Sequence, residues 1–364
     1  MPLATELFDY ELPPECVALD PAERRDGSRL MVVDRAAHAF THASFADLPR
    51  FLRAGDVLFR NNATVIPARL HALRPSGGRV ECLLVESVGN PAVQGTGEVW
   101  RCLVKPGRKL PIGAGFAHPD AAFIGEVVAR EPDGAVLVRF ATRDGESVVA
   151  MARQFGEVPL PPYLGPRRAE QRTADRVRYQ TVYADPDRPV AAAAPTAGLH
   201  FTAGLLAALA TTGVHMRDLT LNVGLGTFQP ISSESVEAHP IHREHYELPV
   251  DSQCALFPPF AGRRIAVGTT AVRAIEDFLA SHSGPLDRTH FAEAGIYLYP
   301  PSLFRGVDAL ITNFHQPRST LLCMVSAFLT PGSTGGIEWL KQIYTEAIRL
   351  RYRFYSYGDA MLIV

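Results

Sequence analysis

The sequence predicts a mixed α/β protein, in which a barrel-like α/β main domain carries an inserted, small all-β barrel domain. Two observations predict this fold class. Between about residues 65 and 154, short apolar runs follow one another with turn residues between them. From about residue 190 onward, apolar runs alternate with stretches of helical spacing, which is typical of a mostly parallel sheet or barrel with helices outside.

The N-terminal section contains a strand-like run, SRLMVVD (28–34), and a helix-like stretch, FADLPRFLRA (45–54). These elements assign residues 1–64 to the α/β domain, which resumes at 155–364. The inserted domain is then 65–154. Its expected strands are joined by turns such as Pro132-Asp133-Gly134 and the Arg-Asp-Gly turn at 143–145, and strands of this length and spacing favour a small barrel or sandwich.

After residue 190 the pattern predicts strands that alternate with helices. A strand at 190–194 leads to a helix at 203–212, which Thr202 is placed to cap and Gly213 to end. Further strands are expected within 214–223, 263–270 and 307–314, and the last two lead into helices. A final helix at 338–352 precedes a closing strand, AMLIV.

Composition excludes several classes of protein. The formal net charge of −2 excludes a strongly basic nucleic-acid binder, although not a local basic face. The five cysteines are scattered and form no CxxC pair, which disfavours a disulfide framework or a zinc knuckle. The N-terminus lacks a signal-peptide core, and no stretch approaches the ~18 apolar residues needed to cross a bilayer. We therefore expect a cytoplasmic protein with no membrane partner.

Four polar turns follow expected strands: PTAGLHFT (195–202), NVGLGTF (222–228), VGTTAVR (267–273) and TNFHQPRST (312–320). Any one of them alone is more often an ordinary helix cap. Because sites gather at the carboxyl ends of strands, four such turns together predict a polar pocket for an anionic group. They offer acid/base candidates and hydroxyl donors: His200 and His315, and Thr196, Thr227, Thr269 and Thr270.

The run His239-Pro-Ile-His242-Arg-Glu-His245 resembles a set of metal ligands, but Pro240 interrupts a helix and no cysteine stands beside it. We expect no metal there; surface histidines in a turn, or a catalytic loop that uses His242 with Glu244, are the alternatives. Phosphate-loop, dinucleotide and GxSxG motifs are absent, which disfavours kinases, ATPases, standard dehydrogenases and α/β-hydrolases.

Two clusters of basic residues have two interpretations. Lys105 lies in the first cluster, with Arg101, Arg108 and Lys109, and the second consists of Arg167, Arg168, Arg172, Arg176 and Arg178. They are either solvated faces or phosphate contacts, since phosphate contacts need local cations rather than a basic chain.

Long motifs along nearly the whole chain resemble the S-adenosylmethionine:tRNA ribosyltransferase-isomerases of queuosine biosynthesis. They include FDYELPPE (8–15), RDGSRL (25–30), GDVLFRNNATVIPARL (55–70), LVKPGRKL (103–110), RYQTVYA (178–184), APTAGLHFT (194–202), VGLGTFQP (223–230), VGTTAVRAIE (267–276), VDALITNFHQPRSTLL (307–322) and YRFYSYGDAMLI (352–363).

The resemblance implies an α/β-barrel-like domain with an inserted β-barrel, and an unusual reaction. The ribosyl part of S-adenosylmethionine moves to a 7-aminomethyl-7-deazaguanine in tRNA and rearranges, giving epoxyqueuosine-tRNA while adenine and methionine leave. It implies S-adenosylmethionine as co-substrate, no prosthetic group, such a tRNA as partner, and a monomer. The reaction needs a base for an acidified C5′ hydrogen, a proton donor for adenine and donors for the methionine carboxylate.

The resemblance also implies site residues. We expect His200 to be the principal acid/base, with His242 and Glu244 next. The matching binding positions are Tyr163, Asp175, Tyr179, Gln180, Thr196, Gly198, Phe201, Gly224, Gly226, Thr227, Thr269, Arg273, Asn313, His315, Ser319, Tyr357 and Asp359.

Five positions depart from the family pattern. Asn62 and Thr64 stand where Asp and Arg are usual, Val177 replaces Glu, Asn222 replaces His, and Gln316 replaces Leu. Asparagine cannot exchange a proton as histidine does. The departures fit drift in an orthologue, or a paralogue that uses S-adenosylmethionine with a different, non-tRNA acceptor. An inactive RNA-binding relative is a third interpretation.

Overall fold

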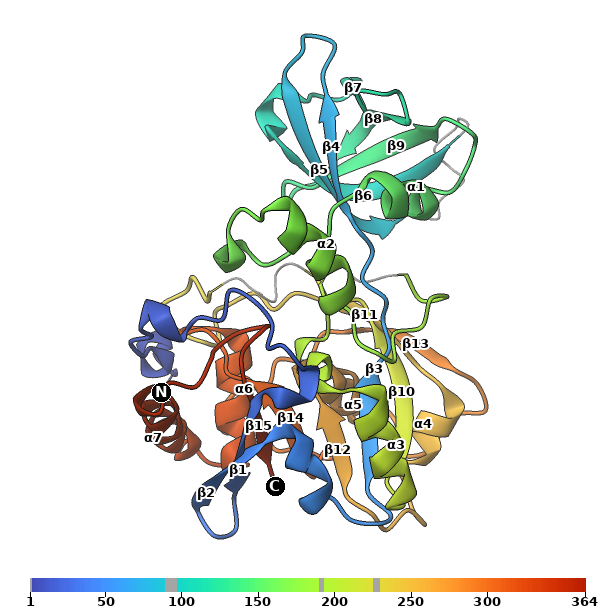
Figure 1. Ribbon diagram of the computed structural model, residues 1–364. Helices are drawn as coiled ribbons and strands as arrows, with labels where there is room; N and C mark the ends of the chain where they lie inside the picture. Colours follow the sequence, from blue (N-terminus) through green and yellow to red (C-terminus); the bar gives the residue numbers. More distant parts are fainter. Residues whose placement is uncertain (1, 89–96, 190–192, 225–229) are drawn as a thin grey trace. The chain divides into compact units, whose positions relative to one another are not determined.

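A computed structural model describes residues 2–88, 97–189, 193–224 and 230–364 (Figure 1). The chain divides into two compact units. The α/β unit consists of Met1–Ala63, Gln180–Arg188 and Ala194–Val364, and the barrel unit of Thr64–Tyr179 and Pro189–Ala193. The expected insertion, 65–154, lies within the barrel unit, which also takes in residues 155–179.

Six antiparallel strands close the barrel unit, in the order β4-β5-β6-β9-β8-β7. Their bounds are β4 Arg69–Leu73, β5 Arg79–Ser87, β6 Glu98–Lys105, β7 Gly115–Ala117, β8 Phe123–Arg130 and β9 Val136–Thr142, and α1 (Val148–Phe155) and α2 (Ala169–Arg178) follow them. Alternate residues fill the interior, where Phe116, Phe123 and Phe140 are buried. Gly134 turns the chain between β8 and β9 with a φ of 90°, so the predicted all-β barrel and this turn are confirmed.

The α/β unit contains a mixed sheet in the order β13-β11-β10-β3-β12-β14-β15-β1-β2. The bounds are β1 Arg29–Asp34, β2 Ala39–Ser44, β3 Val57–Asn61, β10 His215–Leu221, β11 Glu244–Leu248, β12 Arg264–Val267, β13 His290–Ala294, β14 Ala309–Asn313 and β15 Ala360–Ile363. Strands β10, β3, β12 and β14 are parallel, and β15 runs antiparallel to β14. The carboxyl ends of four central strands therefore share one edge, and β15 begins at that edge.

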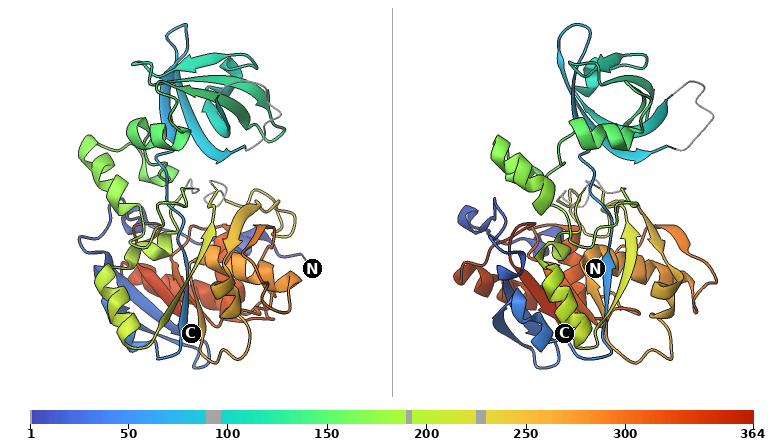
Figure 2. Two further views of the ribbon diagram at one scale, coloured as in Figure 1. Left: turned by 90° about the vertical axis from the view of Figure 1, so that its right-hand side faces the viewer. Right: turned by 45° about the vertical axis from the view of Figure 1, so that its right-hand side comes forward.

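Helices cover both faces of this sheet, and Figure 2 shows α3 and α5 on opposite sides of it. Leu205 and Leu209 of α3 pack with sheet residues such as Leu58 and Ile265, while α5 packs on β3, β10, β12 and β14. The helices are α3 Ala203–Thr211, α4 Val250–Cys254, α5 Thr269–Ser281, α6 Thr320–Leu329 and α7 Gly336–Arg349, with short 3₁₀ turns that include η3 Arg25–Gly27, η4 Phe45–Arg50 and η7 Thr196–His200. Among the helices described, none has the length and apolar content to cross a membrane.

Local sequence signals account for most of these bounds. Thr202 caps α3 by accepting the Leu205 N–H at 3.1 Å, and Gly213 follows the helix with a φ of 85°, as predicted. The helix-like stretch 45–54 is instead a six-residue 3₁₀ helix, because Pro49 inside it has no N–H to donate. The strand expected at 190–194 lies mostly outside the described residues.

Candidate functional site

The carboxyl edge of the central strands is the candidate site. Asn61, Leu221, Val267 and Asn313 end the four parallel strands there, and the pairing of Asn313 with Ala360 brings the start of β15 to the same edge. Three of the four polar turns that the sequence singled out leave from these strand ends. The fourth, which forms η7, reaches the edge through packing against β14.

His200 ends η7 and lies at the centre of this edge. The buried ring stacks on Phe45, with its Nδ1 2.7 Å from Ser28 Oγ and its Nε2 3.1 Å from Asn313 Nδ2. Asn313 Nδ2 also donates to the Tyr355 carbonyl at 3.2 Å, so the amide nitrogen faces the ring and Nε2 must accept. The imidazole is thus a neutral tautomer whose Nδ1–H donates to Ser28.

Burial is the main reason why the pKa of His200 falls from 6.5 to about 3, and the nearby charges of Arg25 and Arg353 lower it as well. The ring is therefore uncharged at neutral pH, with Nε2 as its basic atom. Asn313 Oδ1 is buried and has no hydrogen-bond partner within the described part of the chain.

Gly198 permits a close approach inside η7. A Cβ at this position would lie 2.0 Å from Tyr183 Oη and 2.8 Å from Thr181 Cγ2. The guanidinium carbon of Arg60 lies over the Tyr183 ring, 4.6 Å from the ring centroid. Gly198 therefore serves packing beneath the site, and any larger residue would displace Tyr183. The two other predicted residues here are Thr196, which is half-buried, and Phe201, which is fully buried.

Glu244 and Arg273 form a buried pair at the same edge. Glu244 Oε1 accepts the Gly224 N–H at 3.0 Å, and Oε2 pairs with Arg273 Nη1. Arg273 Nη2 donates to the carbonyls of His242 and Ala294, both at 2.8 Å. The structure thus joins three predicted residues, but His242 contributes its carbonyl while its side chain is exposed.

A small pocket of ≈ 20 Å³ opens beside this pair, lined by His242, Arg273, Tyr297 and Met324 among others. That volume holds about one water molecule. The pocket marks the space next to Arg273 as accessible to a small polar group.

Thr269 and Thr270 begin α5 directly after Gly268, whose φ of 92° makes the turn from β12. Both threonines are buried, and Thr270 Oγ1 has no hydrogen-bond partner among residues that the structure describes. A Cβ at Gly268 would lie 3.6 Å from Ala197 Cβ, so this turn is next to η7. Two separate polar turns of the sequence are thereby in contact.

Two further predicted residues, His315 and Ser319, make contacts within the protein. The ring atom Nε2 of His315 lies 2.7 Å from Thr312 Oγ1. The backbone N–H of His315 donates to Tyr344 Oη at 3.0 Å, and its backbone carbonyl accepts from the Tyr10 hydroxyl. Burial lowers the pKa of His315 to about 3. Ser319 is the N-cap of α6. Both residues hold the turn after β14 in place.

Asp359 joins the starts of β1 and β15. Its carboxylate accepts the Arg29 N–H at 2.9 Å, Arg29 Nε at 3.0 Å and the Arg353 N–H at 2.8 Å. The protein itself therefore supplies donors to both carboxylate oxygens. Tyr357, two residues earlier, is buried.

The remaining predicted residues are distributed over both units. Tyr163 and Tyr179 belong to the barrel unit, as does Asp175, whereas Gln180 begins a segment of the α/β unit. Gly226 and Thr227 lie outside the described residues.

Two of the departures from the family pattern lie at the candidate site. Asn222 donates its N–H to the His245 carbonyl at 2.9 Å, and its buried Oδ1 has no partner in the described ranges. Asn62 Oδ1 accepts from Thr220 Oγ1 at 2.7 Å. Of the other three, Val177 is exposed on α2, Gln316 is half-buried and Thr64 belongs to the barrel unit.

The histidine-rich run does not assemble a metal centre in the described part of the chain, where no group of three or more His, Cys, Asp or Glu side chains could hold a metal ion. His239 packs edge-on against Tyr297, and His245 Nε2 lies 3.3 Å from Glu293 Oε1.

Sequence reasoning missed Ser28, Phe45 and Tyr183 as site residues. Ser28 and Tyr183 lie in the motifs RDGSRL and RYQTVYA, which gave a signal, but nothing in the sequence indicates that Ser28 accepts from His200 or that Tyr183 covers Gly198. The Phe45 contact comes from tertiary packing alone.

Comparisons with known proteins identify the family of the chain. Residues 5–363 match the family described as queuosine biosynthesis protein. The S-adenosylmethionine:tRNA ribosyltransferase-isomerase of Trichlorobacter lovleyi is 44% identical to this chain, over 98% of this chain and 98% of its own length. The enzyme of the same name from Gloeobacter violaceus is 46% identical, over 99% of this chain and 96% of its own length.

The fold is similar to a crystal structure of S-adenosylmethionine tRNA ribosyltransferase from Thermotoga maritima, with a TM-score of 0.53 and 31% identity, over 98% of this chain and 100% of that one. The similarity in sequence and in fold thus extends over both units. The chain belongs to the queuosine biosynthesis protein family.

Proposed function

We propose that this chain transfers and isomerises the ribosyl moiety of S-adenosylmethionine onto 7-aminomethyl-7-deazaguanine in tRNA, with release of adenine and methionine. The observation that carries this proposal is a neutral, buried histidine at a strand edge with unpartnered polar atoms, in a chain similar over its whole length to enzymes named for this activity. S-adenosylmethionine is the co-substrate.

His200 acts in this proposal as the base. Because its proton is on Nδ1 and donated to Ser28, Nε2 carries the lone pair that can accept a C5′ proton of the sulfonium substrate. For this step, the Asn313 amide must give up its hydrogen bond to His200 Nε2. A bound carboxylate or phosphate nearby favours the imidazolium and raises the pKa of His200 toward the working range.

Thr270 Oγ1, Asn313 Oδ1 and Asn222 Oδ1 are assigned to the substrate, because they are buried, have no partner among the described residues and can accept a hydrogen bond from a ligand. Glu244 orients Arg273 and the Gly224 amide, which pair with one oxygen each.

The test is release of adenine and methionine from S-adenosylmethionine, with and without tRNA that bears 7-aminomethyl-7-deazaguanine. Release that depends on the modified tRNA is the expected result. Release without tRNA would favour a paralogue with another acceptor, and tRNA binding without release would favour an inactive RNA-binding relative.

A further inference from the structure

The barrel unit contains a groove that the proposed chemistry does not use. Its volume is ≈ 580 Å³, within the range of ligand sites, and every residue that lines it belongs to this unit. Strands β4, β5 and the end of β6 form one wall, and the segment 157–176 forms the other. Five arginines and lysines line it: Arg69, Lys105, Arg167, Arg172 and Arg176. We call it the basic groove.

Three carboxylates also line the groove, fewer than the cations. Glu81 is shared, because Arg69 Nη1 lies 2.8 Å and Lys105 Nζ 4.0 Å from its Oε1. Arg167 and Asp175 form a buried fork at 2.8 and 3.0 Å.

Glu157 is shared as well, between Arg172 Nε at 3.6 Å and His71 Nε2 at 3.3 Å. Arg176 donates to the carbonyls of Arg153 and Gly156, which carry no charge. The groove therefore keeps an excess of positive charge on accessible side chains: the Lys105 side chain is 83% exposed and that of Arg172 49%.

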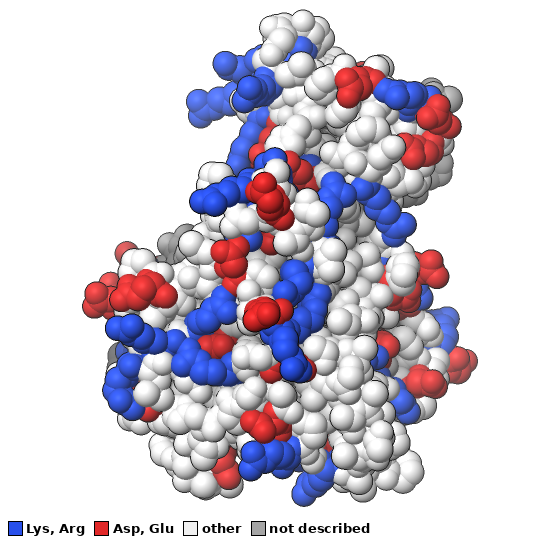
Figure 3. Space-filling model, viewed as in Figure 1, with Lys and Arg blue, Asp and Glu red and all other residues white. Residues whose placement is uncertain are grey.

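The arginines of the helix beside the groove make contacts within the protein, but their spacing does not favour the helix itself. Arg168, Arg172 and Arg176 recur at a spacing of four, so like charges face one another along α2, which destabilises an isolated helix. Within α2, Asp175 is buried, whereas Arg172 and Arg176 are exposed. Figure 3 shows lysine and arginine side chains gathered along the left side of the barrel unit in that view. Cations gathered beyond what the neighbouring carboxylates balance favour a ligand with several anionic groups.

We propose that the basic groove binds the phosphate backbone of the RNA substrate, a proposal that rests on the proposed function. A chain with a net charge of −2 must concentrate its RNA contacts locally, and a groove lined by four arginines and a lysine offers cations to several phosphates. Pro161, Pro162 and Leu160 give the groove an apolar wall against which a ribose or base can pack. A run of aspartate and glutamate residues offers carboxylates but no ring for this wall.

The experiment measures binding of tRNA by fluorescence anisotropy over a series of KCl concentrations. In the double variant Lys105→Gln/Arg172→Gln, we expect the slope of log Ka against log [KCl] to fall by about two, roughly one for each lost phosphate contact. The affinity should fall about tenfold or more at low salt, and KM for tRNA should rise while kcat and KM for S-adenosylmethionine stay unchanged.

Arg143→Gln is the matched control, since Arg143 is an exposed arginine of the same unit in the turn after β9 and does not line the groove. If both variants melt at the same temperature as the wild type, their fold is intact. A double variant that retains the salt slope and affinity of the control would overturn the proposal, as would equally tight binding of a poly-glutamate of equal charge. Because RNA binding is measured without turnover, failure of the proposed reaction is a separate outcome.

Discussion

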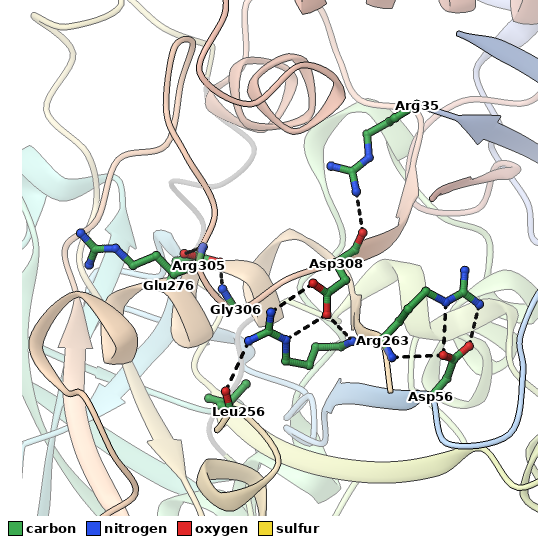
Figure 4. A network of polar contacts seen from close by, with 9 residues as sticks. Arg35, Asp56, Leu256, Arg263, Glu276, Arg305, Gly306 and Asp308 are labelled. Carbon is green, nitrogen blue, oxygen red and sulfur yellow. Dashed lines mark hydrogen bonds and ion pairs between the residues drawn. The ribbon is translucent and has the colours of Figure 1, made fainter. Parts of the chain in front are cut away.

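The two edges of the sheet in the α/β unit differ in how their buried polar groups are satisfied. At the amino-terminal edge, Asp56 precedes β3 and accepts two hydrogen bonds from the Arg263 side chain, at 3.2 and 2.6 Å. Asp308 precedes β14 and accepts from Arg264 at 2.9 and 3.1 Å (Figure 4). Arg35 donates to the Asp308 carbonyl at 2.6 Å. Each charge is paired with a side chain or a backbone group.

Pairing also sets the ionisation of these carboxyl groups. Burial alone would raise the pKa values of Asp56 and Asp308, but hydrogen bonds from Arg263, Arg264 and backbone amides outweigh it and hold both below the ordinary value. The carboxylates are therefore charged at neutral pH, and both ion pairs stay formed.

At the carboxyl-terminal edge, the buried oxygens of Asn222, Thr270 and Asn313 have no partner among the described residues. A buried polar group without a partner costs free energy, so proteins keep few of them. These three lie at the same edge as His200, and we infer that a ligand completes this edge while the ion pairs at the other edge hold the strands together. In parallel α/β folds, active sites lie at the carboxyl ends of the strands, whereas the amino ends serve stability.

The largest expected effect is on turnover at the carboxyl edge. His200→Ala should lower kcat for adenine release by about 10²–10⁴-fold, the contribution typical of a positioned acid/base group. The control is His215→Ala, because His215 begins β10 at the opposite edge and is exposed. Turnover of His200→Ala within a few-fold of the control would remove His200 from the chemistry.

The next effect is on stability at the amino-terminal edge. Arg263→Ala leaves the buried Asp56 carboxylate with only the exposed Arg53 side chain at 3.7 Å as a cationic partner, and loss of one partner of a buried pair costs up to about 3–5 kcal/mol. We expect urea unfolding to show this loss, while kcat per folded molecule at a permissive temperature stays at the wild-type value. A fall in kcat that matches the one in His200→Ala would erase the distinction between the edges.

A smaller effect concerns pH. Because the pKa values of His200 and His315 are lowered to about 3 in the folded state, the unfolded chain binds more protons below pH 6.5. Stability is fully present above pH 6.5 and should fall by about 1.4 kcal/mol per pH unit for each histidine as the pH decreases. Asp56 and Asp308 lose their contribution only below about pH 4.

Urea midpoints between pH 7 and 5 report on these two histidines together with His239 and His290, whose pKa values burial also lowers. His315→Gln should flatten the dependence. An equally steep dependence in His315→Gln would contradict the assignment of a buried neutral imidazole to residue 315.

Much of this architecture could be predicted because local signals determine it. The cap at Thr202, the turn at Gly134 and the alternation of apolar runs are properties of neighbouring residues, and the convergence of polar turns follows from parallel strands. The 3₁₀ helix at 45–50 was missed because apolar spacing does not weigh the missing N–H of Pro49. The pairing of Asp359 with Arg29, 330 residues away, depends on tertiary structure and leaves no local trace.

The most direct test of the contrast between the edges is the shift in melting temperature that S-adenosylmethionine produces in Thr270→Val. Valine keeps the shape of threonine but removes the buried, unpartnered hydroxyl. We predict that the free variant is as stable as the wild type or more so, by up to about 1 kcal/mol, and that the ligand-induced shift is smaller. A less stable free variant with an undiminished shift would contradict the account.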